Sequence, residues 1–295
     1  MILAKKKYID EGCDYLISIG GGSAIDTAKA VKAFLPFEDN GECLLGREHV
    51  YVNVKHVAVP TTAGTGSEST QFSVIYYGGE KQSLDNPSLL PDLAVLDPSY
   101  LKTLPGGQKS ATVLDALCQA TESIWAVRAN EISIAYAKEA IRLIVANVEG
   151  YMRGESDTFA PIMLGANLAG RAINITTTTA AHAMSYKLTT FFGIPHGAAV
   201  AMSMIPVFEY YNTHSDNATV RSHIAEAYGV LTAEDALASF MDICNVCRLK
   251  RDVDCSADEL LELVRGVNPE RLKNYPIKVT SEEIEKMYKT IVNVK

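Results

Sequence analysis

The sequence predicts an α/β part followed by an all-helical part. In the first part, short continuous apolar runs alternate with loops and helical segments, which indicates a mostly parallel sheet. After Gly107 such runs stop and the segments have helical periodicity. We therefore expect a boundary near Leu104–Gly107, which divides the chain into residues 1–107 and 108–295.

Four apolar runs are the expected strands of the first part. They are YLISI, HVAVP, FSVIYY and LAVLD, at Tyr15–Ile19, His56–Pro60, Phe72–Tyr77 and Leu93–Asp97. Runs of this length and composition are typical of buried strands.

Six segments of the second part are expected to be helices. The first is Ile132–Val148, with Asn130 as its N-cap and Gly150 as its stop. The others are Phe159–Ile175, Ala218–Tyr228, Ala233–Cys247, Ser256–Val267 and Ser281–Val292.

Composition narrows the class of protein. The chain is 47% hydrophobic with a net charge of −8, and its cations are scattered, which argues against nucleic acid as a partner. No apolar run approaches the ~18 residues of a membrane span. We see no secretory signal and no disulfide framework among the six cysteines, so we expect a cytoplasmic protein. Cys244 and Cys247 form a CxxC; we favour buried thiols, with a zinc site that includes Cys255 as the alternative.

A glycine-rich turn follows the first expected strand. In YLISIGGGSAIDTAKA, Gly20–Gly22 and Ser23 stand between the strand and a helix. Glycines allow close approach of a ligand, and a helix N-terminus offers unpaired N–H groups that suit a pyrophosphate. Ser23 is placed to cap the helix and to donate to phosphate. The alternative is a tight turn without a ligand.

A second loop, PTTAGTGSEST at Pro60–Thr70, follows another strand end and is rich in hydroxyls and glycines. Two such loops at carboxyl ends of strands favour a nucleotide that lies across an open α/β sheet. The alternative is that the hydroxyls only satisfy the backbone of the loop.

Four side chains suggest a metal site in the helical part. Asp115 and Gln119 are four residues apart in an otherwise apolar helix, so they share one face. His182 follows a run of threonines and His196 lies in GIPHG. An Asp and two His are good ligands for a transition metal, and the Gln carbonyl is a weaker fourth. The alternative is a set of hydrogen-bonded core residues.

Taken together and in order, GGGSAIDTAK, PTTAGTGSE, PDLAVLDP, DALCQATES, AAHAMSY and GIPHG resemble the iron-containing (group III) alcohol dehydrogenases. The resemblance runs from about Tyr15 to the C-terminus. It implies a truncated Rossmann-like, dehydroquinate synthase-like α/β part and an all-α C-terminal domain. Within the family, the sequence most resembles the phosphonoacetaldehyde reductase (hydroxyethylphosphonate dehydrogenase) branch.

The resemblance also implies a cofactor, NAD or NADP, and a divalent metal, Fe or Zn. The implied cofactor-binding residues are Gly21, Gly22, Ser23, Asp26, Thr61, Thr62, Thr65 and Lys81. The implied metal ligands are Asp115, Gln119, His182 and His196.

The sequence departs from the family pattern in two ways. The chain begins later than family members do, so the region that selects NAD or NADP is expected to be missing. Gln119 stands where histidine is usual, which we interpret as a modified site.

The expected reaction is hydride transfer from NAD(P)H to a small aldehyde, for example phosphonoacetaldehyde to 2-hydroxyethylphosphonate. His182 and His196 are the catalytic candidates, as metal ligands or, without metal, as proton donors to the carbonyl oxygen. Arg171 and Lys187 are candidates to bind the phosphonate. The alternatives are an alcohol or diol dehydrogenase of the same family, or an inactive nucleotide-binding remnant. The family suggests a homodimer.

Overall fold

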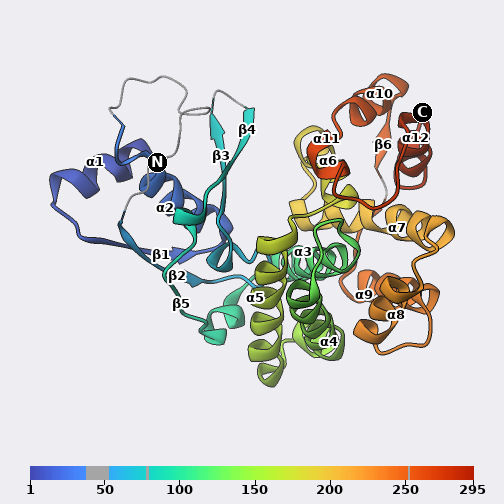
Figure 1. Cartoon of the computed structure of the whole chain (residues 1–295), viewed down its shortest axis with the longest axis horizontal. Coiled ribbons are helices and arrows are strands. Elements are labelled where there is room, and N and C mark those ends of the chain that lie inside the picture. Colours follow the sequence, from blue (N-terminus) through green and yellow to red (C-terminus); the bar gives the residue numbers. More distant parts are fainter. Residues whose placement is uncertain (38–52, 78–79, 252) are drawn as a thin grey trace.

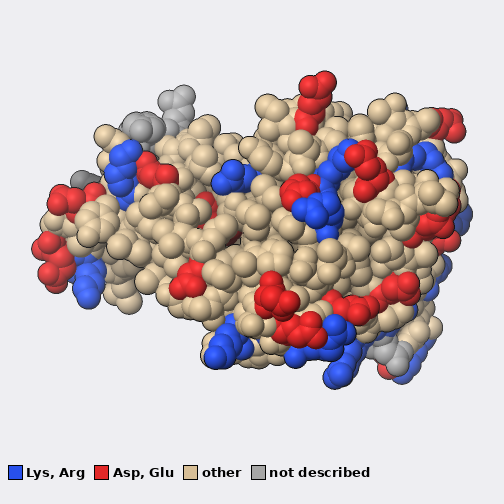
Figure 2. Space-filling model, turned by 90° about the horizontal axis from the view of Figure 1, so that it is seen from below, with Lys and Arg blue, Asp and Glu red and all other residues tan. Residues whose placement is uncertain are grey.

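The computed structural model describes residues 1–37, 53–77, 80–251 and 253–295. The strands and the first two helices gather on one side, and the long helices fill the other (Figure 1). The helix α3 (Gly106–Trp125) begins next to the predicted boundary. On the face drawn in Figure 2, acidic and basic side chains are interspersed rather than separated into patches of one sign.

The central sheet is parallel, as predicted. It contains β1 (Tyr15–Gly20), β2 (Lys55–Pro60) and β5 (Leu93–Ala94) in the order β1-β2-β5. Every pairing is parallel, and β1 and β2 run in register over their whole length. The helix α2 (Gly22–Phe34) packs on β1 and β2, and α1 (Ile2–Asp10) packs on α2. The sheet therefore presents the carboxyl ends of β1 and β2 together.

The run Phe72–Tyr77 forms a strand, but not one of the parallel sheet. As β3 it pairs antiparallel with β4 (Glu80–Asp85) in a separate two-stranded sheet. Contacts with α2 explain this position: Ser73 donates to the Asp26 carbonyl at 2.8 Å, and the amide of Val74 donates to the Asp26 carboxylate at 3.0 Å. These bonds hold β3 against the helix, away from the edge of the sheet.

The second part is helical, as predicted. Its helices are α3, α4 (Glu131–Arg153), α5 (Phe159–Thr176), α6 (Ala180–Phe192), α7 (His196–His214), α8 (Ala218–Tyr228), α9 (Ala233–Val246), α10 (Ala257–Arg265), α11 (Pro269–Leu272) and α12 (Ser281–Lys289). Short 3-10 turns lie at Ser67–Ser69, Pro87–Leu89, Pro98–Thr103 and Ser156–Thr158. Two short strands, β6 (Asp254–Cys255) and β7 (Asn293–Val294), pair in parallel and add a small sheet that we did not predict.

At the centre of the helical part is α3. Every residue from Val113 to Trp125 is buried, and the helix packs against α4, α5 and α7. A helix buried on all sides belongs to a core. Polar side chains on such a helix need partners inside the protein, so Asp115 and Gln119 stand out.

The predicted stop of α4 at Gly150 is wrong. Asn130 caps the helix as predicted, but the helix continues to Arg153 and ends at Gly154, whose φ is 86°. Gly150 is buried inside the helix, and a Cβ there would lie 2.6 Å from Glu155 and Thr158. Gly150 thus allows close packing rather than ending the helix.

The cysteines of the CxxC are buried and free, and so is Cys255. Burial raises the pKa of Cys244 and of Cys247 to about 12, which keeps both thiols protonated. This agrees with the buried-thiol interpretation. Within the described ranges, none of the helices has both the length and the apolar character that a membrane span needs.

Candidate active site

The candidate site begins on one face of α3. Asp115, Gln119 and Glu122 follow each other at helical spacing, and all three are buried. Glu122 is fully buried, and its Oε1 accepts hydrogen bonds from the hydroxyl of Thr179 at 2.6 Å and from the amide of Ala181 at 2.9 Å. The start of α6 is therefore fixed to α3 through this carboxylate.

His182 lies in the first turn of α6, and Glu122 orients it. The Nδ1 of His182 forms a short hydrogen bond with Oε2 of Glu122, and its Nε2 lies 3.3 Å from Oδ1 of Asp115. The imidazole is buried. A ring nitrogen held by a carboxylate fixes the orientation of the ring and leaves the other nitrogen for a ligand.

His196 is the first residue of α7, and a glycine brings it to α3. A Cβ on Gly197 would lie 1.8 Å from the carbonyl oxygen of Ala111, so only glycine fits there. This approach sets α7 directly against α3 one turn before Asp115. The rings of His196 and His182 meet edge to face at 5.7 Å.

The structure brings three of the four predicted metal ligands together. Ligand atoms of Asp115, His182 and His196 all lie within 4.8 Å of one another. Gln119 joins from the same face of α3: its Nε2 donates to the carbonyl of Thr65 at 3.4 Å, while its Oε1 is buried and has no hydrogen-bond partner. A buried acceptor without a donor is costly unless something else binds it. One carboxylate, two imidazoles and this amide oxygen fit a divalent transition metal.

The electrostatics of the cluster favour a positive charge. Burial opposes charge on both His182 and Glu122, but their mutual attraction and hydrogen bonds outweigh it. The pKa of His182 is raised to about 9, because Glu122 and Asp115 stabilise its cation against that burial. The pKa of the Glu122 carboxyl is lowered. The carboxyl groups of Glu122 and Asp115 inside a core favour a cation, either a proton on His182 or a metal ion.

The glycine-rich turn has the predicted strand–turn–helix form. Gly20 has a φ of 153°, Gly21 is the N-cap of α2, and a Cβ on Gly22 would lie 2.8 Å from Oγ1 of Thr65. The amides at the start of α2 have no side-chain cap. Ser23 is therefore not the cap that we predicted; it lies within the first turn and is exposed.

The second loop lies directly beside the first. The amide of Thr61 donates to the Gly20 carbonyl at 3.0 Å, and Thr62 lies 3.4 Å from the position of a Cβ on Gly21. With Thr65 against Gly22, three of the predicted cofactor residues thus border the glycines. Together the two loops form a cradle of small side chains and backbone amides, which fits a pyrophosphate.

Asp26 joins the loops rather than pointing away from them. Its carboxylate accepts from the hydroxyl of Ser67 at 2.5 Å and from the amide of Val74. Lys29, one turn later, is fully buried and donates to Ser67 at 3.0 Å and to Thr70 at 3.1 Å. The positions of Asp26 and Lys29 indicate that they shape the second loop.

The second loop also touches the helical part. Gly66 has a φ of 61°, and a Cβ there would lie 2.4 Å from the Cα of Gly170 on α5. Asn167 on α5 donates to Glu68 at 3.0 Å and to Ser69 at 2.6 Å. Since the Thr65 carbonyl accepts from Gln119, the cradle predicted to bind phosphate and the cluster of predicted metal ligands adjoin across one loop.

Three predicted residues either lie away from the ligand cluster or have side chains outside the residues that the structure describes. Lys81 is on β4, but its side chain lies outside the described residues. Arg171 is exposed; it donates to Asn167 at 3.1 Å and lies over the ring of Tyr136. Lys187 packs against Gly266 and lies over the ring of Phe191.

Sequence reasoning missed three residues of the site. Glu122 had a signal, since it follows Asp115 at seven residues on the same helix face. Tyr186 follows His182 by four residues, and its ring stacks on His196 at 6.3 Å. Arg271 hydrogen-bonds Tyr186. No local pattern could place Arg271 there, because it lies far away in the sequence.

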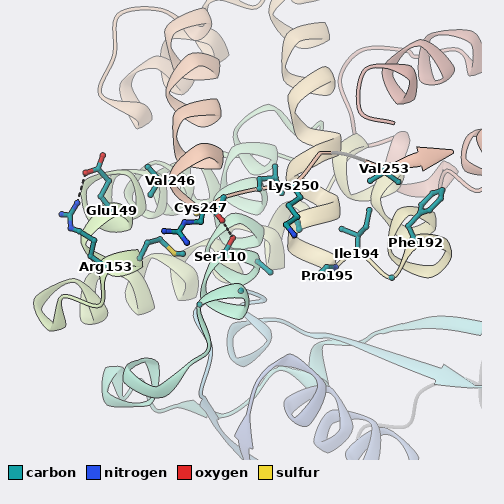
Figure 3. Close-up of a pocket in the computed structure, with 18 of the residues that line it drawn as sticks. Ser110, Glu149, Arg153, Phe192, Ile194, Pro195, Val246, Cys247, Lys250 and Val253 are labelled. Carbon is teal, nitrogen blue, oxygen red and sulfur yellow. Dashed lines mark hydrogen bonds and ion pairs between the residues drawn. The ribbon is translucent and has the colours of Figure 1, made fainter. Parts of the chain in front are cut away.

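A cavity of about 1050 Å³ lies beside this site, within the helical part. Figure 3 shows its lining, which includes Ser110 on α3, Arg153 on α4, Pro195 before α7, and Cys247 and Lys250 after α9. None of the four predicted metal ligands lines it. The cavity is thus separate from the ligand cluster, although Pro195 directly precedes His196.

One curated protein and two solved structures illustrate what this chain is similar to. The phosphonoacetaldehyde reductase of Streptomyces viridochromogenes is 34% identical over 209 residues, which cover 67% of this chain and 53% of that protein. An iron-containing alcohol dehydrogenase from Thermotoga maritima has 30% identity and a TM-score of 0.84, over 98% of this chain and 78% of that chain. A sulfoacetaldehyde reductase from Bifidobacterium kashiwanohense in complex with NAD+ shares the fold at 24% identity, with a TM-score of 0.93, over 98% of this chain and 79% of that chain.

The chain spans about half, or less, of the length of the first curated relatives that it matches. Residues 3–98 match the family described as iron-containing alcohol dehydrogenase, and residues 109–292 match the C-terminal domain of the Fe-containing alcohol dehydrogenase family. These matches together span both parts of the fold. The chain belongs to the iron-containing alcohol dehydrogenase family.

Proposed function

We propose that this protein transfers a hydride between NAD(P)(H) and a small aldehyde or alcohol. The observation that carries the proposal is the hydrogen bond from Gln119 to Thr65, which joins the metal-ligand cluster to the loop of the phosphate cradle. Gly21 and Gly22 would hold the pyrophosphate of the dinucleotide, and the second loop joins these glycines to α3. If bound, a nicotinamide cofactor would supply the hydride and a divalent cation would polarise the carbonyl.

The protein's own residues position and charge this site. Asp115, His182 and His196 would hold the cation, with the Oε1 of Gln119 as a fourth ligand. Glu122 holds Nδ1 of His182, which keeps Nε2 turned toward Asp115. Without metal, the raised pKa of His182 keeps a proton on this residue, which makes it a proton donor to the alkoxide oxygen.

Phosphonoacetaldehyde is the substrate we favour, and reduction to 2-hydroxyethylphosphonate is the favoured direction. The 34% identity with a phosphonoacetaldehyde reductase supports this choice. We also propose NAD or NADP as cofactor and Fe or Zn as metal. A homodimer and a cytoplasmic location stay predictions from the sequence.

Turnover tests the proposal. The purified protein, loaded with Fe²⁺ or Zn²⁺, is assayed with phosphonoacetaldehyde and with butyraldehyde, each with NADH and NADPH. We expect reduction of phosphonoacetaldehyde with the higher kcat/KM. A clear preference for butyraldehyde would favour a simple alcohol dehydrogenase. Absence of any turnover in a folded, metal-loaded protein would favour a nucleotide-binding protein without catalysis.

A further inference from the structure

We propose that Arg271 binds the anionic group of the substrate, a short aldehyde that carries a phosphonate, sulfonate or carboxylate. This inference rests on the proposed function and names the residue that recognises the substrate class. It moves that role away from Arg171 and Lys187, which the sequence suggested.

The segment that carries Arg271 is anchored beside the site. Asn268 caps α11 by accepting from the amide of Arg271 at 3.0 Å. Asn274 is buried and donates to the carbonyl of Thr176 at 2.7 Å and to the hydroxyl of Thr177 at 3.2 Å. Those threonines precede His182, so α11 is tied to the segment that also positions the metal ligand.

The side chain of Arg271 reaches toward the ligand cluster. Its guanidinium is hydrogen-bonded to the hydroxyl of Tyr186 and lies over the ring of Phe72 on β3, 5.9 Å from the centroid. The ring of Tyr186 is stacked nearly parallel on that of His196, with an interplanar angle of 9°. A single aromatic ring thus separates Arg271 from a metal ligand. Since Phe72 belongs to the α/β part, Arg271 also lies where the two parts meet.

In the part of the chain that the structure describes, the charge of Arg271 has no carboxylate partner. Over the described ranges, no Asp or Glu pairs with its guanidinium within ion-pair distance. The site's own carboxylates, Asp115 and Glu122, both face His182 instead. A guanidinium carries five N–H donors in a planar fork, so donors remain after the bond to Tyr186, and they match the oxygens of a phosphonate or carboxylate.

The cofactor's pyrophosphate, the other anionic group expected at the site, has a binding place of its own. The cofactor's pyrophosphate would lie on the backbone amides at Gly21 and Gly22, beside the second loop. Arg171 and Lys187 are less suited, because Arg171 is exposed and bonded to Asn167, and Lys187 packs on Gly266. An aldehyde whose carbonyl lies at the ligand cluster would therefore direct an attached anion toward Arg271.

Kinetics with charged and neutral aldehydes test the assignment. Phosphonoacetaldehyde, sulfoacetaldehyde and succinate semialdehyde are compared with butyraldehyde for the wild type, Arg271→Gln, Arg271→Lys and a control, Arg265→Gln. Arg265 is an exposed arginine on α10 that pairs with Glu262 at 3.1 Å. We expect Arg271→Gln to lower kcat/KM for the preferred anionic aldehyde by roughly 10- to 100-fold, mostly through KM, with little change for butyraldehyde. Arg271→Lys keeps the charge and restores part of the loss.

Loss of activity on all four aldehydes to the same extent would overturn the proposal, since it would indicate a structural role. An unchanged preference for anionic aldehydes in Arg271→Gln would overturn it too. If Arg271→Gln does not fold, Arg271→Lys decides. The quantity compared with the wild type is kcat/KM for the anionic aldehyde divided by kcat/KM for butyraldehyde. The anionic aldehyde that loses most identifies which of the three groups the site prefers.

Binding separates this proposal from the proposed function. Phosphonoacetate, which cannot be reduced by hydride transfer at its carboxylate, is titrated calorimetrically into the wild type and each variant. A wild type without turnover would refute the proposed function, yet weaker phosphonoacetate binding by Arg271→Gln would still support Arg271 as the anion receptor. Equal binding by the wild type and Arg271→Gln would refute the receptor.

Discussion

The carboxylate of Glu122, fully buried on α3, forms a hydrogen bond with Nδ1 of His182 on α6 and so orients this imidazole. Because Thr179 and the amide of Ala181 satisfy its other oxygen, the carboxylate cannot turn away. This pair determines which nitrogen of His182 faces Asp115. Metal affinity should therefore depend on the hydrogen bond between Glu122 and His182.

We predict that Glu122→Gln lowers metal affinity by roughly 10- to 100-fold, because an amide supports the imidazole less well than a carboxylate does. Competition with a chromophoric chelator measures that affinity for Zn²⁺. The control is Glu139→Gln, at an exposed ion pair with Arg142 on α4. Equal affinity in Glu122→Gln and wild type would show that Glu122 does not support a metal ligand.

Gln119→His is expected to strengthen metal binding. Imidazole is a better ligand for Fe²⁺ or Zn²⁺ than a neutral amide oxygen, and the Oε1 of Gln119 lies buried without a hydrogen-bond donor. The amount of metal that survives dialysis against chelator, measured by elemental analysis, should rise. Gln108→His, at an exposed position in the first turn of α3, should leave retention unchanged. Weaker retention by Gln119→His would mean that this side chain does not face the ion.

Gly22→Ala is expected to weaken NADH binding at least tenfold. The new Cβ would lie 2.8 Å from Oγ1 and 2.9 Å from Cγ2 of Thr65, so Thr65 or the loop that carries it must shift and the cradle changes shape. Titration of NADH fluorescence measures the change. Gly107→Ala is the matched control, because a Cβ there meets nothing within 4 Å. Normal NADH affinity in Gly22→Ala would place the dinucleotide elsewhere.

His56 should make the protein sensitive to acid. It is fully buried in β2, bonded to Ser18 of β1 at 2.8 Å, and burial together with the charges of Lys29 and Lys32 lowers its pKa to about 4. The unfolded chain, with an ordinary pKa near 6.5, binds more protons between these values. The contribution of neutral His56 to the free energy of unfolding is therefore fully present above the pKa of the unfolded chain. It falls as the pH falls, by about 2 kcal/mol between pH 7 and pH 5.

Urea unfolding at both pH values measures this loss. His56→Gln keeps a polar group beside Ser18 but has no proton to gain, so the free energy of unfolding should depend less on pH. The control is His214→Gln, an exposed histidine at the end of α7. A pH dependence identical in wild type and His56→Gln would contradict the prediction.

Local patterns were sufficient for several elements and for the helical spacing of Asp115 and Gln119, but they did not predict α6 and α7, which carry His182 and His196. The strand at Tyr15, the glycines and the helix after them follow from residue type and order alone. The Asp115 and Gln119 pair follows from helical spacing. Each of these inferences depends on residues that are near one another in the chain, where sequence carries most of the information.

The errors lie where distant segments decide the outcome. A short apolar run such as Phe72–Tyr77 reads as a strand, but its sheet depends on the bonds that Asp26 makes. A glycine such as Gly150 reads as a stop, although it allows a neighbour to pack closely. Arg271 reaches the site only through the fold of α11. In each case the missing information is tertiary.

The ligands Asp115, His182 and His196 come from three separate helices, α3, α6 and α7. An ion bound there would act as a crosslink between segments that the unfolded chain holds far apart, so the unfolded chain offers it no preformed partner. Occupancy would then add to the thermal stability of the helical part, by about 2.7 kcal/mol at a free metal concentration one hundred times Kd. The melting temperature would become a measure of how full the site is.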